Sequence, residues 1–205
     1  MHTKTLAAIS ALAGLLGAAL PAQAIIVSSG LVSIAVPDNI DGVYLNMVTG
    51  AFGAVPPVGY DINPYTAGAG QFNLWGATTT TWLATSGVVA GPYPIAFGTP
   101  ISAAGLFFRP GGGTNVGTQV TLNATNLFGV QFLNEGPAIT NYGWVAMTFG
   151  ASAGVRTITG WAYETSGAEI LAGAVPEPGS YAMLLAGLAV VGGVAARSRK
   201  ANATA

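Results

Sequence analysis

The chain has 205 residues with six Lys and Arg against seven Asp and Glu, a formal net charge of −1 at pH 7, and no cysteine. A chain with this few cations lacks the basic surface that nucleic-acid phosphates require. We therefore expect no nucleic-acid partner. The missing cysteines exclude disulfides, and packing and sheet hydrogen bonds must therefore hold any folded domain together.

The first 24 residues have the pattern of a secretory signal peptide. Lys4 precedes an apolar run over 6–20, and the segment closes with Ala22-Gln23-Ala24, the small-x-small pattern that signal peptidase accepts. The apolar run is too short to be a comfortable membrane span. We therefore expect the Sec machinery and signal peptidase as partners, export through the inner membrane, and cleavage after Ala24.

Residues 25–174 form a series of short β-prone runs interrupted by Gly, Pro and Asn, with no long segment of helical period. This pattern predicts one all-β domain, a β-sandwich or jelly roll. Turn signals fall at 56–57, 63–64, 91–92, 110–113 and 136–137. The expected strands are 25–36, 42–49, 72–85, 87–97, 101–109, 117–122, 127–133, 142–149, 155–164 and 168–172.

The residue types that the region 25–174 lacks exclude much of enzyme chemistry. It contains no His, Lys or Cys, and its only cations are Arg109 and Arg156. Ser-His-Asp and Cys-His sites need an imidazole, and zinc, copper and non-haem iron sites rely on His and Cys ligands. We expect no cofactor, although carboxylate chemistry and oxygen-ligand metals stay open.

The densest acidic group comprises Asp38, Asp41 and Asp61. Carboxylate and amide oxygens around 37–42 are the hard ligands that Ca²⁺ takes. The spacing is not that of an EF-hand loop, however, and Asp41-Gly42 is an ordinary turn pair. The sequence favours a turn over a calcium site.

Glu135 and Glu164 are a second candidate pair, as the acid and nucleophile of a glycosidase. Glu135 precedes Gly136-Pro137, which indicates a loop, and Glu164 ends an expected strand, where a solvated acid is normal. The sequence favours the non-catalytic interpretation of both residues, and we expect no enzyme activity.

The tryptophans could stack on sugar rings, with Asn and Asp side chains binding hydroxyls. In a chain with so little charge, most large aromatics are needed in the core instead. Glycan binding, with exopolysaccharide as the possible ligand, is the alternative to a core role for Trp75, Trp82, Trp144 and Trp161.

The C-terminal segment 175–205 combines three elements in a fixed order. Val175-Pro176-Glu177-Pro178 resists helix and sheet, the uncharged run 181–196 follows, and the cations Arg197, Arg199 and Lys200 come next. The run predicts a short transmembrane helix, which the stems of the cations extend by snorkelling. The cations stay cytoplasmic under the positive-inside rule and stop the helix there.

This order of elements resembles the PEP-CTERM sorting signal. The resemblance implies an exosortase, a membrane cysteine protease-transpeptidase of Gram-negative bacteria, as a partner. It implies transient anchoring in the inner membrane, cleavage near the motif, and transfer to the cell surface or the exopolysaccharide matrix. An ordinary single-pass anchor is the alternative.

Two stretches of the body also resemble PEP-CTERM proteins of unassigned function. They are Gly42–Gly50 with Tyr60–Tyr65, and Asn141–Val145 leading to Trp161–Glu164. We therefore expect a non-enzymatic exported protein with a structural or adhesive role. The alternatives are a calcium-assisted carbohydrate-binding module and a glycoside-active jelly roll.

Overall fold

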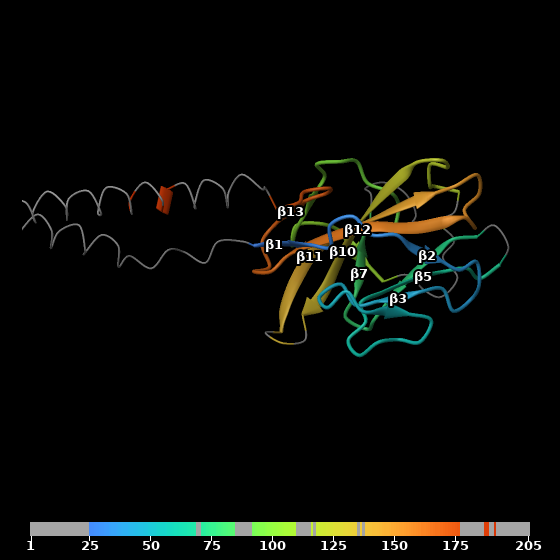
Figure 1. The fold of residues 1–205 in the computed structure, drawn as a ribbon, viewed down its shortest axis with the longest axis horizontal. Helices are drawn as coiled ribbons and strands as arrows, with labels where there is room; N and C mark the ends of the chain where they lie inside the picture. Colours follow the sequence, from blue (N-terminus) through green and yellow to red (C-terminus); the bar gives the residue numbers. More distant parts are fainter. Residues whose placement is uncertain are drawn as a thin grey trace, which may run out of the picture.

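A computed structural model describes residues 25–68, 71–84, 92–109, 116, 118–134, 136, 138–176, 187–188 and 191. Between residues 25 and 176, all regular elements of the described part are β-strands, which confirms the all-β prediction (Figure 1). The strands are β1 (Ile26–Ser28), β2 (Ile34–Val36), β3 (Tyr44–Leu45), β4 (Phe52–Gly53), β5 (Ile62–Tyr65), β6 (Asn73–Gly76), β7 (Thr81–Leu83), β8 (Pro100–Ile101), β9 (Phe107–Phe108), β10 (Thr125–Asn134), β11 (Ile139–Phe149), β12 (Arg156–Glu164) and β13 (Ile170–Leu171).

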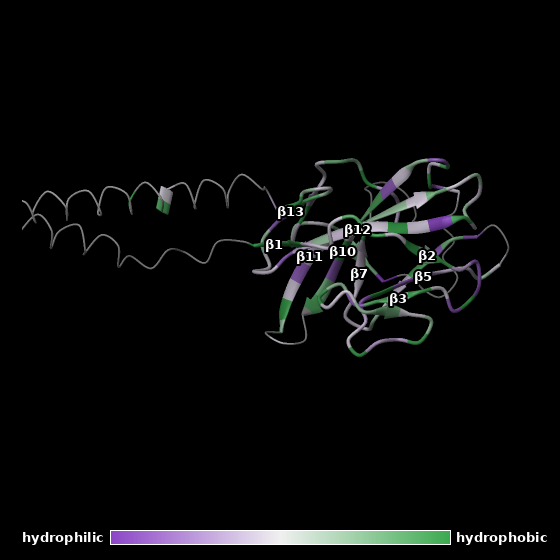
Figure 2. Cartoon of the chain, in the orientation of Figure 1, coloured by the Kyte–Doolittle hydropathy of each residue, from purple (hydrophilic) through white to green (hydrophobic). Residues whose placement is uncertain are grey.

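The strands form three antiparallel sheets. The seven-stranded sheet has the order β1-β12-β11-β10-β7-β9, with β2 also paired to β12. A four-stranded sheet has the order β4-β3-β5-β6, and β13 pairs with β8 in the third. The long strands β10, β11 and β12 are rich in aromatic and β-branched residues, which favour pleated sheet. Their hydropathy changes from residue to residue, as Figure 2 shows.

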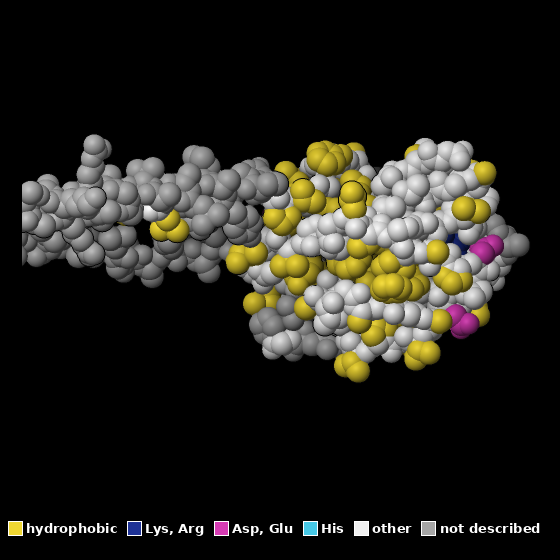
Figure 3. Space-filling model, in the orientation of Figure 1, with side chains coloured by type: hydrophobic (Ala, Val, Ile, Leu, Met, Phe, Trp, Pro, Cys, Tyr) yellow, Lys and Arg dark blue, Asp and Glu magenta, His cyan; other side chains and the backbone are white. Residues whose placement is uncertain are grey.

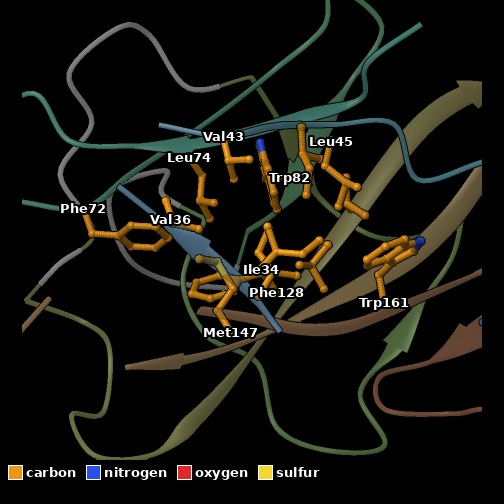
Figure 4. Packing of buried hydrophobic residues seen from close by; sticks show 14 of the residues in the cluster. Ile34, Val36, Val43, Leu45, Phe72, Leu74, Trp82, Phe128, Met147 and Trp161 are labelled. Carbon is orange, nitrogen blue, oxygen red and sulfur yellow. The ribbon is translucent and has the colours of Figure 1, made fainter. Parts of the chain in front are cut away.

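The main core lies between the seven-stranded and the four-stranded sheets (Figure 4). Leu45, Ile62 and Leu74 enter it from the small sheet, and each is at most 1% exposed. The large sheet contributes alternate residues of its central strands, because successive side chains point to opposite faces. These include Phe128, Val130, Phe132, Val145, Met147, Ile158, Trp161 and Tyr163.

A second hydrophobic cluster covers part of the opposite face of the large sheet. Trp144 and Ala146 of β11 belong to it, whereas Val145 and Met147 belong to the main core. Ile101 of β8 and Ile170 of β13 pack on this face. The third, two-stranded sheet is thus a cover for the outer side of the large one.

The structure corrects several strand boundaries. Asn63-Pro64, expected as a turn, lies inside β5, and Pro64 pairs with Leu74 while its carbonyl accepts the amide of Val43. Proline has no amide N–H to donate but keeps its carbonyl as an acceptor. Pro64 therefore fits this strand, because the Val43 amide needs only the Pro64 carbonyl. The expected strand 117–122 is a turn region where it is described, and 25–36 divides into β1 and β2 at Gly30, whose φ is +65°.

Two further predictions, the signal peptide over 1–24 and the transmembrane helix over 181–196, lie wholly or mostly outside the described residues. Of the expected strand 87–97, residues 92–97 are described, and they form no strand, because Ile95 makes only an isolated bridge to Leu127. Of the helix, Gly187, Leu188 and Val191 are described and helical. Among the described residues, no helix is long and apolar enough to cross a bilayer. The assignment to a sandwich or jelly roll stays a prediction.

Arg156 at the start of β12 is a buried cation that connects distant loops. Its side chain is fully buried, and its guanidinium donates to the carbonyls of Ala153 (2.7 Å) and Pro37 (3.0 Å) and to Thr66 Oγ1 (2.5 Å). A longer contact joins it to Asp38 at 3.5 Å. Burial lowers the pKa of Arg156, while the charge of Asp38 acts in the opposite direction. The cation therefore holds three segments together at one edge of the core.

Candidate functional site at the junction with the sorting segment

Backbone hydrogen bonds at Ala172 and Ala174 hold the chain where it leaves the domain. After β13, the amide of Ala172 donates to Thr99 and its carbonyl accepts the amide of Gly98, both at 2.9 Å. Ala172 is fully buried in the second cluster. The amide of Ala174 then donates to the carbonyl of Leu171 at 2.9 Å. Residues up to 174 are therefore part of the fold and do not form a linker.

Trp144 holds the end of this segment from the large sheet. Its indole Nε1–H donates to the carbonyl of Ala174 at 2.9 Å. The side chain is 6% exposed and lies in the second cluster, against which Ala174 also packs. Trp144 points outward because its neighbour Val145 points into the main core. A buried tryptophan normally finds a partner for its N–H, and here the partner is the carbonyl of Ala174, three residues after β13.

Val175 and Pro176, with which the predicted Val-Pro-Glu-Pro motif begins, lie directly beyond this contact. Val175 is 50% exposed, and both Val175 and Pro176 line a groove of about 710 Å³. Trp144, Thr159 and the highly exposed Leu31 are also among the groove residues, all of which are uncharged. The rest of the predicted sorting and processing residues, namely Glu177, Pro178, Arg197, Arg199, Lys200, Ala22 and Ala24, lie outside the described part.

The N-terminal end of the domain lies close to this exit. β1 begins two residues after Ala24 and pairs with β12, with Ile26 opposite Glu164. The carbonyl of Ile25 accepts the amide of Thr165 at 3.1 Å. Ile26 and Ala174 pack on the same second cluster, and Figure 1 shows β1 and β13 at one end of the domain. Entry and exit of the chain therefore share one end.

The structure does not bring the three candidate calcium ligands together. Asp38 accepts a hydrogen bond from Thr66 Oγ1 at 2.6 Å, and Asp41 is exposed, with its carbonyl bound to Asn63. Asp61 is buried and accepts the amide of Met47 at 2.7 Å. Within the described ranges, no group of three or more His, Cys, Asp or Glu residues is arranged to hold a metal ion.

Asp61 instead holds the backbone of Met47, which contacts the large sheet. The carbonyl of Met47, whose amide Asp61 binds, accepts the indole N–H of Trp161 at 2.9 Å. The charge of Asp61 also reaches Tyr163, where burial and then this carboxylate raise the pKa of the phenol. The carboxylate thus supports the backbone of the small sheet against β12.

We expect Asp61→Ala to lower the free energy of unfolding by about 2–3 kcal/mol, because the buried Met47 amide loses a charged acceptor. Urea titration with calcium or with EDTA measures the loss, which should be the same in both. Asp41→Ala, at an exposed position, is the matched control and should change little. A loss confined to the calcium titration would assign Asp61 to a metal site instead.

Glu164 is not the solvated acid that its place at a strand end predicted. It is 1% exposed, and its two carboxylate oxygens accept the amides of Ser166 at 2.8 Å and Ala168 at 2.5 Å. The acid therefore shapes the loop from β12 to β13. Glu135, its candidate catalytic partner, lies outside the described residues.

The tryptophans are mostly core residues, as the sequence favoured. Trp82, Trp144 and Trp161 are 0%, 6% and 5% exposed. Trp75 is half-buried, with the guanidinium of Arg109 5.0 Å from its ring centroid. It lines a shallow pocket of about 200 Å³ together with Ile40, Asn63 and Tyr65. Of the four tryptophans, Trp75 has the most access to solvent.

No local residue pattern in the sequence indicates the structural roles of Trp144 and Glu164. A tryptophan that binds a distant carbonyl and a core tryptophan look alike in sequence. Both residues lie in the stretches that resemble other PEP-CTERM bodies, and that resemblance is the one feature that could have singled them out.

The comparisons with known proteins agree with this junction. A family model described as the PEP-CTERM protein-sorting motif matches residues 174–200. No curated protein and no solved structure matches the chain significantly. The match begins at Ala174, the residue whose carbonyl Trp144 binds. The chain therefore carries a PEP-CTERM protein-sorting motif, and this motif starts where the described β domain ends.

Proposed function

We propose that the protein is an exported, non-enzymatic component of the cell surface or extracellular matrix, delivered there by an exosortase, with a structural or adhesive role. The observation that carries the proposal is the sorting motif at 174–200, which continues the described β domain without a break. In this proposal residues 1–24 are removed by signal peptidase. The run 181–196 anchors the chain in the inner membrane until the exosortase acts.

The character of the domain supports a structural role. The described carboxylates of Asp38, Asp61 and Glu164 each hold a backbone or side-chain partner of the fold. The face in Figure 3 has few charged side chains, and hydrophobic side chains lie among backbone and other uncharged groups. Such a surface suits contacts with neutral polymers or with other copies of an exported protein. A two-layer β-sandwich is the fold that we propose for it.

The alternatives have less support. Carbohydrate binding keeps one observation, the pocket beside Trp75, because the other three tryptophans are buried. The calcium-assisted form would need ligands other than the group of three acids. The glycosidase alternative would have to use Glu164, whose oxygens already hold two backbone amides.

Intact mass and N-terminal sequencing of the protein test the proposal, in envelope and medium fractions with and without the exosortase. We expect a product that starts at Ile25, lacks the segment 181–205, and is lost when the exosortase gene is deleted. The double variant Pro176→Ala, Pro178→Ala of the full chain should not be cut and should keep the segment 181–205, as in the strain without the exosortase. A chain that keeps 181–205 in every strain would instead be a permanent membrane anchor.

A further inference from the structure

The folded domain binds the chain at the start of the sorting motif and limits how far this part of the chain can move. Ala172 is fully buried, the carbonyl of Ala174 is bound by Trp144, and Val175 directly after it is 50% exposed. A protease binds several residues on the acyl side of the scissile bond in extended form, so these residues must be free of other backbone partners. For a cut before Pro176, they would include the Ala172–Ala174 segment, which would have to leave the domain.

The distance to the membrane restricts this segment further. Four residues, 177–180, lie between Pro176 and Tyr181, the first residue of the predicted membrane helix. The five steps from Pro176 to Tyr181 span at most about 18 Å when the chain is fully extended. A chain this short cannot present the motif far from the domain. The place where the domain releases the chain therefore decides which peptide bonds a membrane protease can reach.

We infer that Trp144 is a positioning residue for C-terminal processing. Its hydrogen bond to Ala174 holds the first motif residue on the domain, so that the exosortase cuts on the C-terminal side of Pro176. The inference rests on the proposed function. Cleavage breaks one peptide C–N bond: the acyl carbon passes to water or to an acceptor amine, and the leaving amine takes a proton and becomes the N-terminus of the membrane segment.

Trp144→Phe tests this role, because it keeps an aromatic ring in the second cluster and removes the N–H donor. Loss of one hydrogen bond to a part-buried carbonyl should raise the undocked population of 172–174 about fivefold. Trp161→Phe is the matched control. Trp161 is equally buried and donates to a backbone carbonyl at the same distance of 2.9 Å, but this carbonyl belongs to Met47 in the main core.

The full-length variants are expressed in the host with its exosortase, and the C-terminus of each released product is read by mass. Wild type and Trp161→Phe should end at Pro176 or later. Trp144→Phe should add products that end between residues 171 and 175. Amide hydrogen exchange of the uncut full-length protein should show Ala172 and Ala174 exchanging about fivefold faster in Trp144→Phe alone.

Two results would overturn the positioning role while leaving the sorting proposal intact. One is a wild-type product that ends before Pro176, and the other is an identical set of products and exchange rates in Trp144→Phe and wild type. Equal changes in both variants would reduce Trp144 to a general stabilising residue. A wild-type chain that is never cut would refute the sorting proposal itself, and the positioning role with it.

Discussion

Replacing Arg156 with methionine is expected to lower the free energy of unfolding by about 3–5 kcal/mol. Methionine can fill the space of the side-chain stem, but it donates no hydrogen bonds. The carbonyls of Pro37 and Ala153 and the hydroxyl of Thr66 would lose their buried donor. Domains of this size are stable by only about 5–15 kcal/mol, so the loss is a large share of the total. The urea midpoint of the exported domain measures it.

Arg109→Met is the matched control for this experiment. Arg109 is exposed and lies over the ring of Trp75, so its replacement should cost no more than about 1 kcal/mol. Asp38→Asn should also have a small effect, because the Asp38 side chain is 44% exposed and its ion pair with Arg156 is long at 3.5 Å. Equal losses in Arg156→Met and Arg109→Met would contradict the proposed role of the buried guanidinium.

Replacing Gly42 with alanine should destabilise the domain by about 3 kcal/mol or more. Gly42 has a φ of +57°, a conformation that costs other residues free energy. A Cβ at this position would also collide with the carbonyl oxygen of Pro64 and lie 2.7 Å from Tyr65 Cα, both of which belong to β5. Backbone atoms of a central strand of the small sheet cannot move aside cheaply. Thermal unfolding followed by circular dichroism measures the loss.

Gly30→Ala separates the cost of the positive φ from the cost of the steric collision. Gly30 has a similar φ of +65°, but no atom lies within 4 Å of a Cβ placed there. This variant should lose only the conformational part, about 1–2 kcal/mol. A loss in Gly42→Ala no larger than that in Gly30→Ala would show that the small sheet shifts to accept the methyl group.

The long strands could be predicted from sequence because the residues within each strand favour the strand conformation. Over 127–133, 142–149 and 155–164 the expected strands fall within β10, β11 and β12 or differ by one residue at an end. Aromatic and β-branched residues, alternation and flanking turns all point the same way there. The C-terminal sorting segment could likewise be recognised, because its order of elements is local to 27 matched residues.

The features that the sequence did not predict depend on contacts between residues far apart in sequence. Asn63-Pro64 is a turn signal locally, yet it lies in a strand because β3 and β6 flank it. Glu164 looks solvated until the loop that follows folds back onto its carboxylate. The partner of Trp144 is 30 residues away, and no local pattern indicates it. Of the candidate calcium ligands, Asp38 and Asp61 bind separate partners in the fold, Thr66 and the Met47 amide, and Asp41 is exposed.

The pairing of β1 with β12 has a consequence for the order of folding. Ile26 lies opposite Glu164, so the first strand of the domain finds its partner only after nearly the whole domain has been made. β2 also pairs with β12, which makes the two earliest strands dependent on the last long one. Such long-range pairing makes folding slow and leaves sheet edges open in the meantime. A chain exported from its N-terminus would stay unfolded for most of its passage, and it would complete its large sheet as the sorting segment reaches the membrane.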